Sequence, residues 1–163
     1  MAQQDEIIRV WLAETRGQLI ENYLRLGLKA SGQWANSLES FQEKTATGQK
    51  LGIIGQDYTD QLENGRLPNK NQGEKALRAW VGWAGSTFLA QWVKDKGLPH
   101  NPFAVAWKIA KKGWDVPNQH NAGGLVSDVI TDEWIGELGS KLINASINDI
   151  RSDILKQFKD FKK

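Results

Sequence analysis

Two histidines and two aspartates are the side chains of this sequence that could do acid–base or metal chemistry. They are His100, Asp115, His120 and Asp128. Imidazole and carboxylate groups carry protons and ligate metals, but the spacing of these four residues fits no ligand motif. Both histidines also lie in segments rich in Pro, Asn and Gly, which favours solvated loop histidines. A small metal-dependent hydrolase is therefore only a third hypothesis for this chain.

Other catalytic signatures are absent from the sequence. It contains no cysteine, which excludes disulfides, Cys-ligated zinc and thiol chemistry. It contains no G-x-S-x-G, no Walker loop and no H-E-x-x-H motif. Glu63 alone does not make the acid–base pair that glycoside hydrolysis needs. We therefore expect no catalytic residue, no cofactor and no metal ligand, and hence a protein that is not an enzyme.

A second group of residues could bind nucleic acid. It comprises the lysines and tryptophans of residues 92–112, namely Trp92, Lys94, Lys96, Trp107, Lys108, Lys111 and Lys112. A basic surface holds phosphates, and aromatic rings stack on bases. However, the net charge is only +2, both tryptophans fit apolar helix faces, and lysines are expected near helix C-termini because of the helix dipole. Nucleic-acid binding through Lys94–Lys112 is the alternative hypothesis.

The element around which the chain is organised lies at residues 51–80. Its apolar run at 51–54 is typical of a buried strand end. Asp57 is a candidate N-cap for a short helix, which is expected to end at Gly65, where a left-handed residue is favoured. Pro68 prevents that helix from resuming. The sequence then predicts a polar loop followed by a longer helix.

Hydrophobic periodicity predicts helices through most of the remaining chain. Apolar residues at helical spacing indicate helices over 4–28, 74–93 and 103–112, and from Thr131 or Asp132 to about Phe161. Gly85 and Ser86 are expected to kink or split the second of these helices. Composition predicts loops over 69–73, 94–102 and 115–124.

Alternating side chains predict a β-hairpin over residues 33–54. The first strand is expected over 33–40 and the second over 50–54, with a turn at 45–49. A two-stranded hairpin is only marginally stable alone. It therefore needs packing from the helices, or a third strand from this chain or a neighbour. Together these elements predict an α+β fold with a small antiparallel hairpin sheet.

Bulk composition predicts one globular domain over residues 1–163. Apolar residues make up 40% and charged residues 25% of the chain, which is typical of folded proteins. The content of eight tryptophans favours a protein that packs against other proteins. The start of the sequence is acidic and shows no secretion signal. The longest uncharged stretch, residues 79–93, is too short to span a membrane.

One part of the sequence resembles a known protein family. A strand is followed by G-x-D-Y-x-x-x-L-E-x-G-R-x-P, whose matching residues are Gly55, Asp57, Tyr58, Leu62, Glu63, Gly65, Arg66 and Pro68. A Trp-x-x-x-x-Gly sequence at 92–97 and an Ala-rich segment at 104–113 continue the pattern. In these features, residues 31–113 resemble the tail-completion, or neck, proteins of tailed bacteriophages. The uncharged insertion at 82–90 departs from the short helix that is usual in the family.

The resemblance implies a structural virion protein at the head–tail junction, made in the host cytoplasm. Proteins of this family form rings that join the portal or its adaptor to the tail. The implied partners are further copies of the chain and the portal, adaptor or tail proteins, with no cofactor and no membrane. DNA would meet such a protein only by passing through the lumen of the ring. A ring requires a heterologous interface that closes on itself.

The predicted subunit interface comprises Tyr58, Glu63, Gly65, Arg66 and Pro68. A short helix stopped at a glycine would hold this loop rigidly, so that a contact there costs little ordering entropy. Tyr58 and Leu62 are expected to point inward and leave Glu63 and Arg66 facing outward. Arg66 would then reach a carboxylate or carbonyl of the next chain with its planar guanidinium. The alternative is a solvated Glu63–Arg66 ion pair that contributes little.

Overall fold

The computed structural model describes residues 2–29, 31–46, 48–69 and 73–160. In chain order its elements are α1 (Ala2–Arg25), α2 (Gln33–Asn36), β1 (Glu39–Thr45), β2 (Gly48–Ile54), α3 (Thr59–Asn64), β3 (Gly65–Arg66), α4 (Glu74–Ser86), α5 (Phe88–Asp95), α6 (Pro102–Lys112), β4 (Trp114–Asp115) and α7 (Asp132–Asp160). The strands pair in two small antiparallel sheets, β1 with β2 and β3 with β4. The predicted α+β class is confirmed.

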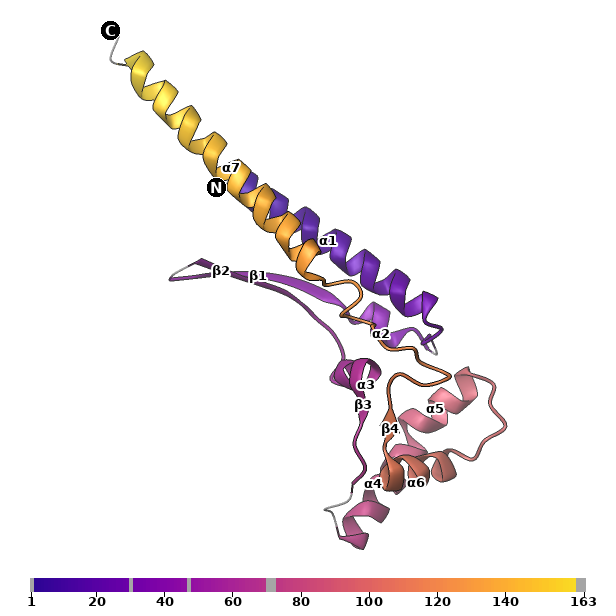
Figure 1. The fold of residues 1–163 in the computed structure, drawn as a ribbon. Helices are drawn as coiled ribbons and strands as arrows, with labels where there is room; N and C mark the ends of the chain where they lie inside the picture. Colours follow the sequence, from indigo (N-terminus) through magenta and orange to yellow (C-terminus); the bar gives the residue numbers. More distant parts are fainter. Residues whose placement is uncertain (1, 30, 47, 70–72, 161–163) are drawn as a thin grey trace.

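The two longest helices, α1 and α7, lie side by side and run in opposite directions (Figure 1). They pack because Ile8 and Trp11 recur on one face of α1 and meet Leu138 of α7. The rings of Trp11 and Trp134 stack with their centroids 6.1 Å apart. The indole N–H of Trp134 donates to the buried hydroxyl of Thr15 at 2.8 Å. This contact joins the first element of the chain to the last.

The C-terminal part of α7 continues beyond the first turn of α1. The side-chain amide of Gln4, at the start of α1, donates to the hydroxyl of Ser146 at 2.8 Å. Figure 1 shows α7 extending from this level past the N-terminus and away from the rest of the fold. Ile150 and Ile154, in this part of the helix, are 60% and 47% exposed. A helix of a few turns is marginal in water without packing on one face.

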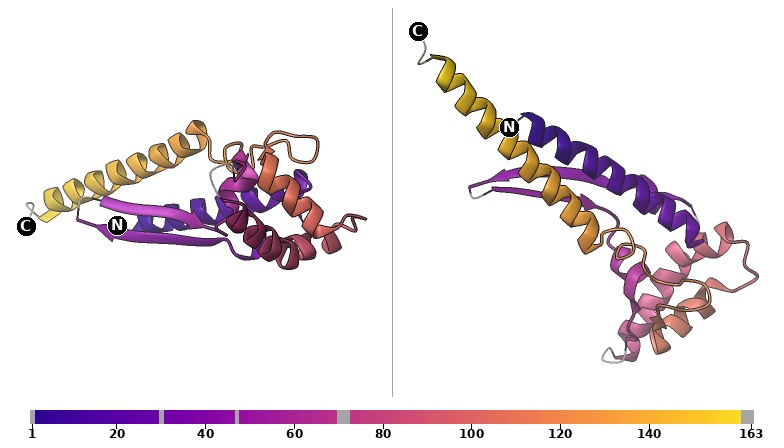
Figure 2. Two further views of the ribbon diagram at one scale, coloured as in Figure 1. Left: turned by 90° about the horizontal axis from the view of Figure 1, so that it is seen from below. Right: turned by 45° about the horizontal axis from the view of Figure 1, so that its top comes forward.

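The hairpin of β1 and β2 runs alongside α1 (Figure 2). Its register pairs Phe41 with Gly52 and Gln42 with Leu51. One face points to α1, where the amide of Gln42 donates to Asp5 at 3.2 Å and Leu51 packs in the same cluster as the α1–α7 contact. The ring of Phe41 covers Gly52 on the other face. The helix therefore supplies the packing that a two-stranded sheet lacks alone.

Helices α4, α5 and α6 form a separate cluster, at the other end of the molecule from the free end of α7 (Figure 1). Ala84 of α4 and Ala106 of α6 are both fully buried, and such small side chains allow helices to pack closely. Gly85 lies against the ring of Phe103, which occupies the space that a Cβ would need. The side chain of Asn101 caps α6 by accepting from the Phe103 N–H at 2.9 Å.

The predicted strand over 33–40 is wrong in its first half. Residues 33–36 form α2, and β1 begins only at Glu39. Gly32 adopts a φ of 83° and turns the chain into this short helix. The buried residues Trp34 and Leu38 are four positions apart, which is helical spacing that also satisfies an alternating pattern. The second strand is confirmed and begins at Gly48, while the predicted turn includes residue 47, outside the described residues.

Three other predicted boundaries are confirmed. The helix predicted over 74–93 splits, since α4 ends at Ser86 and α5 begins at Phe88. Thr131 caps α7, because its hydroxyl accepts from the Trp134 N–H at 3.2 Å. The helix predicted over 103–112 begins one residue earlier. Residues 70–72 of the predicted polar loop and Phe161 of the last helix lie outside the described residues. In the described ranges, no helix combines the length and apolarity needed to cross a membrane.

The packing of α7 predicts that truncating a side chain lowers the free energy of unfolding strongly on the face against α1 and hardly at all on the opposite face. Leu138→Ala should lower the free energy of unfolding by about 2–5 kcal/mol, because Leu138 is 7% exposed and its removal leaves a cavity against α1. Ile143→Ala is the matched control, since Ile143 is 61% exposed, and its effect on the monomer should stay within about 0.5 kcal/mol. Urea unfolding below the concentration of self-association measures both. Equal losses for the two variants would contradict this assignment of faces.

Candidate functional site

The predicted interface residues lie in a clasp, which we define as residues 58–68 together with residues 113–130. Strand β3 pairs with β4 so that Gly65 faces Asp115 and Arg66 faces Trp114. Gly65 adopts a φ of 84°, so a glycine with positive φ ends α3 as predicted. A Cβ at Gly65 would collide with the Trp114 carbonyl. The two backbones are therefore held in direct contact at this point.

The end of α3 is capped by side chains from the second part of the clasp. The last carbonyls of a helix have no partner within it. Here the Gln61 carbonyl accepts from the Gly65 backbone N–H and also from the indole N–H of Trp114 at 3.3 Å. The Leu62 carbonyl accepts from the side-chain amide of Asn121 at 2.7 Å. Asn121 is buried, so this contact satisfies a buried side-chain amide and a carbonyl at the end of α3 at once.

The carboxylate of Glu63 holds the turn that precedes α7. It accepts from the backbone N–H of Val126 at 2.8 Å and of Ser127 at 3.2 Å, and from the Ser127 hydroxyl at 2.5 Å. These bonds are charge-assisted, and they provide acceptors for backbone N–H groups at the start of a turn. Partial burial raises the pKa of Glu63, but these bonds together outweigh it and hold the pKa below its usual value. The prediction that Glu63 faces outward is therefore wrong.

Arg66 also makes contacts within the chain. Its guanidinium donates to the Asn69 side chain at 2.9 Å and lies over the ring of Trp80, 4.1 Å from the centroid. Desolvation by partial burial lowers the pKa of Arg66. The geometry thus places Arg66 in a cation–π contact with α4. The alternative of a Glu63–Arg66 ion pair is wrong, because each side chain binds a different part of the clasp.

The remaining interface residues contribute to the clasp in different ways. Pro68 lies against Gly113, whose φ of 69° brings the two backbones together. Tyr58 is 37% exposed, so it points inward less than expected. It occupies the N-cap position of α3 without a side-chain cap. The prediction that Asp57 is the cap is wrong because the helix begins two residues later, at Thr59.

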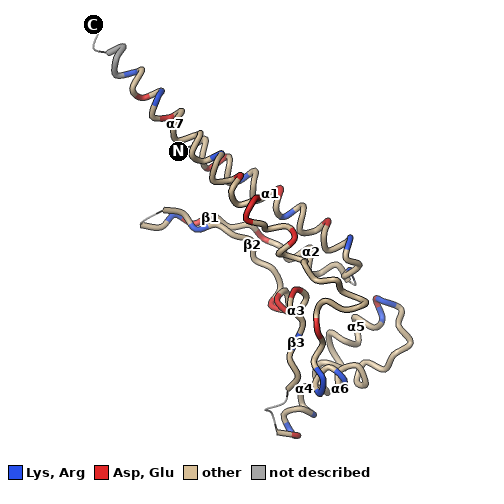
Figure 3. Tube along the Cα trace, viewed as in Figure 1, with Lys and Arg blue, Asp and Glu red and all other residues tan. Residues whose placement is uncertain are grey.

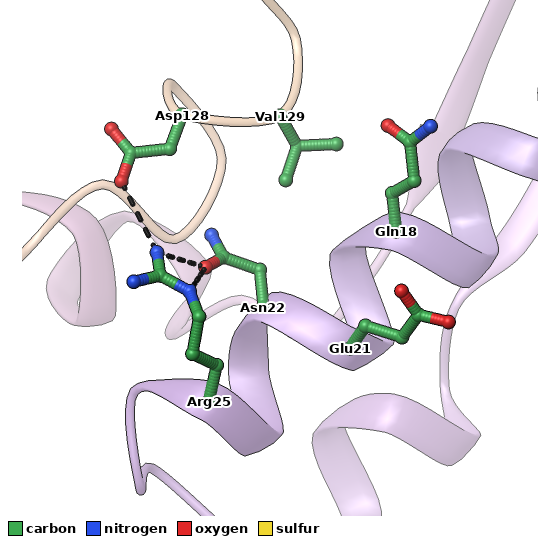
Figure 4. A pocket seen from close by; sticks show the side chains of 6 residues that line it. All are labelled: Gln18, Glu21, Asn22, Arg25, Asp128 and Val129. Carbon is green, nitrogen blue, oxygen red and sulfur yellow. Dashed lines mark hydrogen bonds and ion pairs between the residues drawn. The ribbon is translucent and has the colours of Figure 1, made fainter.

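An open hollow lies where α1 meets the clasp (Figure 4). It is lined by Gln18, Glu21, Asn22, Arg25, Asp128 and Val129. The buried amide of Asn22 donates to the carbonyls of Gly124 and Leu125 at 2.7 and 3.0 Å. Arg25 donates to the side-chain oxygen of Asn22 at 2.6 Å and to the carboxylate of Asp128 at 3.5 Å. Through these bonds Asn22, Arg25 and Asp128 fasten the clasp to α1.

The clasp and its attachment to α1 depend on residues that the sequence analysis did not single out. Asn22, Trp114, Asn121 and Leu125 supply its caps and its fully buried centre. Asn121 lies in a loop rich in Asn and Gly, where amide side chains commonly bind the backbone. Nothing local in the sequence distinguishes Asn22 from any other polar residue of α1.

The candidate metal and acid–base residues do not form a site in the described part of the chain. His100 and His120 are both exposed. The side chain of His120 lies 2.8 Å from the Gln119 amide. Asp128 pairs with Arg25, as described above. Among the described residues, no three His, Cys, Asp or Glu side chains are grouped so that they could hold a metal ion.

The candidate nucleic-acid-binding lysines lie in two separate places. Figure 3 shows the basic positions at the end of α5 apart from those at the end of α6. Lys96 donates to the Gly27 carbonyl at 2.6 Å, and Lys111 lies 4.8 Å from the centroid of the Trp107 ring. Trp107 packs against the α4–α6 cluster. The described structure therefore does not gather these residues into one basic strip beside free aromatic rings.

The molecule exposes far more surface than a compact protein of its mass. Its accessible surface is 11417 Å², whereas a compact monomer of 18.3 kDa exposes about 8,100 Å². The surplus of about 3,000 Å² exceeds the roughly 800 Å² that one partner contributes to a standard protein interface. Many exposed apolar residues belong to α7, among them Ile143, Ile147, Ile150, Ile154 and Leu155.

No protein-family model matches this chain, and neither a curated protein sequence nor a solved structure matches it.

The hydrogen bonds of Glu63 predict a pH-dependent contribution to stability. Because its folded pKa lies below the ordinary 4.5, the contribution is fully present above about pH 5 and is lost as the pH falls through the folded pKa. Glu63→Gln should therefore lower the free energy of unfolding by about 1 kcal/mol at pH 7, and less at pH 3. Asp60→Asn, in the same helix, is the control. A Glu63→Gln effect that stays constant from pH 7 to pH 3 would contradict this account.

The contacts of Arg66 predict that its truncation weakens the monomer. Arg66→Ala removes a cation–π contact and a hydrogen bond, and should lower the free energy of unfolding by about 1–2 kcal/mol. The control is Arg9→Ala, because Arg9 is exposed and its guanidinium pairs with exposed Glu6 on the surface of α1. Its effect should stay under about 0.5 kcal/mol. Thermal unfolding that is unchanged by Arg66→Ala would restore an outward-facing role for this side chain.

Proposed function

We propose that this protein is a structural component of a tailed-bacteriophage virion at the head–tail junction. In this proposal it assembles with copies of itself into a ring that joins the portal or its adaptor to the tail. It acts by assembly, without turnover, and DNA passes through the lumen. The main support for self-assembly is the accessible surface of the chain, which exceeds that of a compact monomer of the same mass by about 3,000 Å².

The distribution of this surface supports a ring. Each subunit of a ring has two different contact surfaces, one for each neighbour. The chain is elongated, with α7 extending from one end and the α4–α6 cluster at the other (Figure 1). Among the described residues, three small hydrophobic clusters hold the fold in place of one large core. Such a chain gains stability when neighbours cover the apolar side chains that it leaves exposed.

The place in the virion rests on the resemblance of residues 31–113 to tail-completion proteins. The motif residues Glu63, Gly65, Arg66 and Pro68 all contribute to the clasp, so the motif has a clear role in folding. Its role at the subunit interface stays a prediction. If the clasp also meets a neighbour, it does so through its outer backbone and Tyr58, because the charged groups of Glu63 and Arg66 are bound within the chain.

The experiment that tests this proposal is assembly of the purified full chain. We expect closed rings by negative-stain electron microscopy and a single oligomer by analytical ultracentrifugation. We also expect the chain to co-purify with phage particles and to be located at the neck by labelling with a specific antibody. Rings that do not associate with phage particles would support the proposed self-assembly and contradict the proposed location at the head–tail junction. A chain that stays monomeric at every concentration and in the presence of portal would contradict the proposal.

A further inference from the structure

Four exposed isoleucines of α7 form one row on the side of the helix that faces away from α1. Leu138 and Ala145, which face α1, are 7% and 3% exposed, whereas Ile147 and Ile150 are 49% and 60% exposed. The row comprises Ile143, Ile147, Ile150 and Ile154. Its spacing of four, three and four residues is that of the a and d positions of a coiled coil. The row therefore fits the side of another helix.

Helix α1 has a matching row on its outer side. Val10 and Leu24 are 40% and 49% exposed, Ala13 and Gly17 between them are also exposed, and half-buried Ile20 completes the same spacing. Ala13 and Gly17 leave a depression in this row, since a Cβ built at Gly17 meets no atom within 4 Å. Large isoleucines on one helix and small residues on the other are complementary in shape.

The charges beside the two rows are complementary in one orientation only. In heptad terms, Arg9 and Arg16 occupy g positions of α1, and Glu14 and Glu21 occupy e positions. Beside the α7 row, Asp153 occupies a g position and Arg151 an e position. Antiparallel helices bring g beside g and e beside e, which pairs each acid with a base. Parallel helices bring g beside e, which would place Arg beside Arg and Glu beside Asp.

We propose that the outer row of α7 packs antiparallel against the outer row of α1 in a second copy of this chain. One register satisfies both shape and charge. It sets Ile154 against Ala13 and Ile150 against Gly17, and it brings Arg151 beside Glu14 and Asp153 beside Arg16. The inference rests on the proposed self-assembly and identifies its contact. Because two different surfaces meet, each copy can bind a neighbour on both sides, and the chain of contacts closes when the helices are inclined to the ring axis.

Substitutions on the two rows test this contact in the full chain. Ile150→Asp and Gly17→Gln should each raise the concentration for half-assembly by about tenfold or more, as measured by sedimentation velocity. Both positions are exposed in the monomer, so neither variant should lower the temperature of thermal unfolding, and Gly17→Gln should raise it slightly because glycine is a poor helix former. The matched controls are Ile135→Asp and Gly136→Gln, which lie on exposed parts of α7 that face no residue of α1 in this register, because α1 ends at Arg25. These controls should assemble as the wild type does.

A mixture of the two variants distinguishes the proposed contact from its alternatives. Ile150→Asp retains an intact α1 row and Gly17→Gln retains an intact α7 row. Their equimolar mixture should therefore form a complex of two chains and stop there, although neither variant assembles alone. A contact between two α7 rows would instead be unaffected by Gly17→Gln. Unimpaired assembly of Gly17→Gln would overturn the pairing of α7 with α1.

Charge reversal provides a second, independent readout. Arg16→Asp and Asp153→Arg should each weaken assembly, and the double variant should recover most of the wild-type association because the pair is restored with reversed charges. A double variant that assembles no better than either single variant would overturn the proposed register. A wild-type chain that never self-associates would overturn both this contact and the proposed ring. A wild type that assembles alongside unimpaired row variants would overturn this contact alone.

Discussion

The arrangement of the helices in this protein depends on the hydrogen bonds of the Glu63 carboxylate. It binds the turn at Val126 and Ser127 and so fixes where the chain enters α7. From that point α7 can lie along α1, and the stacked rings of Trp11 and Trp134 follow. A single side chain can hold this position because its bonds are charge-assisted and partly shielded from water. A residue of the short helix α3 thus sets the position of the longest helix, α7.

The same arrangement explains why the molecule has several small clusters in place of one core. The α4–α6 cluster meets the rest of the chain mainly through β3, β4 and the contact of Arg66 with Trp80. Helices α1 and α7 bury one face each and leave the opposite face uncovered. The apolar residues of these helices are therefore divided between the buried faces inside the monomer and the exposed faces on its surface. That division is typical of chains whose stable state is an assembly.

Local patterns in the sequence predicted most elements but few of the contacts between them. Helices with strong periodicity, the break near Ser86 and the cap at Thr131 were predictable because each depends on neighbouring residues. The α2 helix was missed since the spacing of Trp34 and Leu38 fits two periods equally well. The partners of Glu63 lie more than sixty residues away, so no local pattern could predict them. The role of Arg66 was misjudged for a similar reason, because Arg66 lies in β3 whereas its partner Trp80 lies in α4.

The pairing of α1 with α7 has a consequence for how the chain is made. The first helix leaves the ribosome long before its partner, because α1 ends at Arg25 and α7 begins at Asp132. At usual rates of synthesis the delay is on the order of 5–20 s. During this time Ile8 and Trp11 lack Leu138 of α7, their partner in the same cluster. The hairpin, which follows α1 closely in the chain, contributes Leu51 and Ile53 to that cluster and is synthesised long before the last helix.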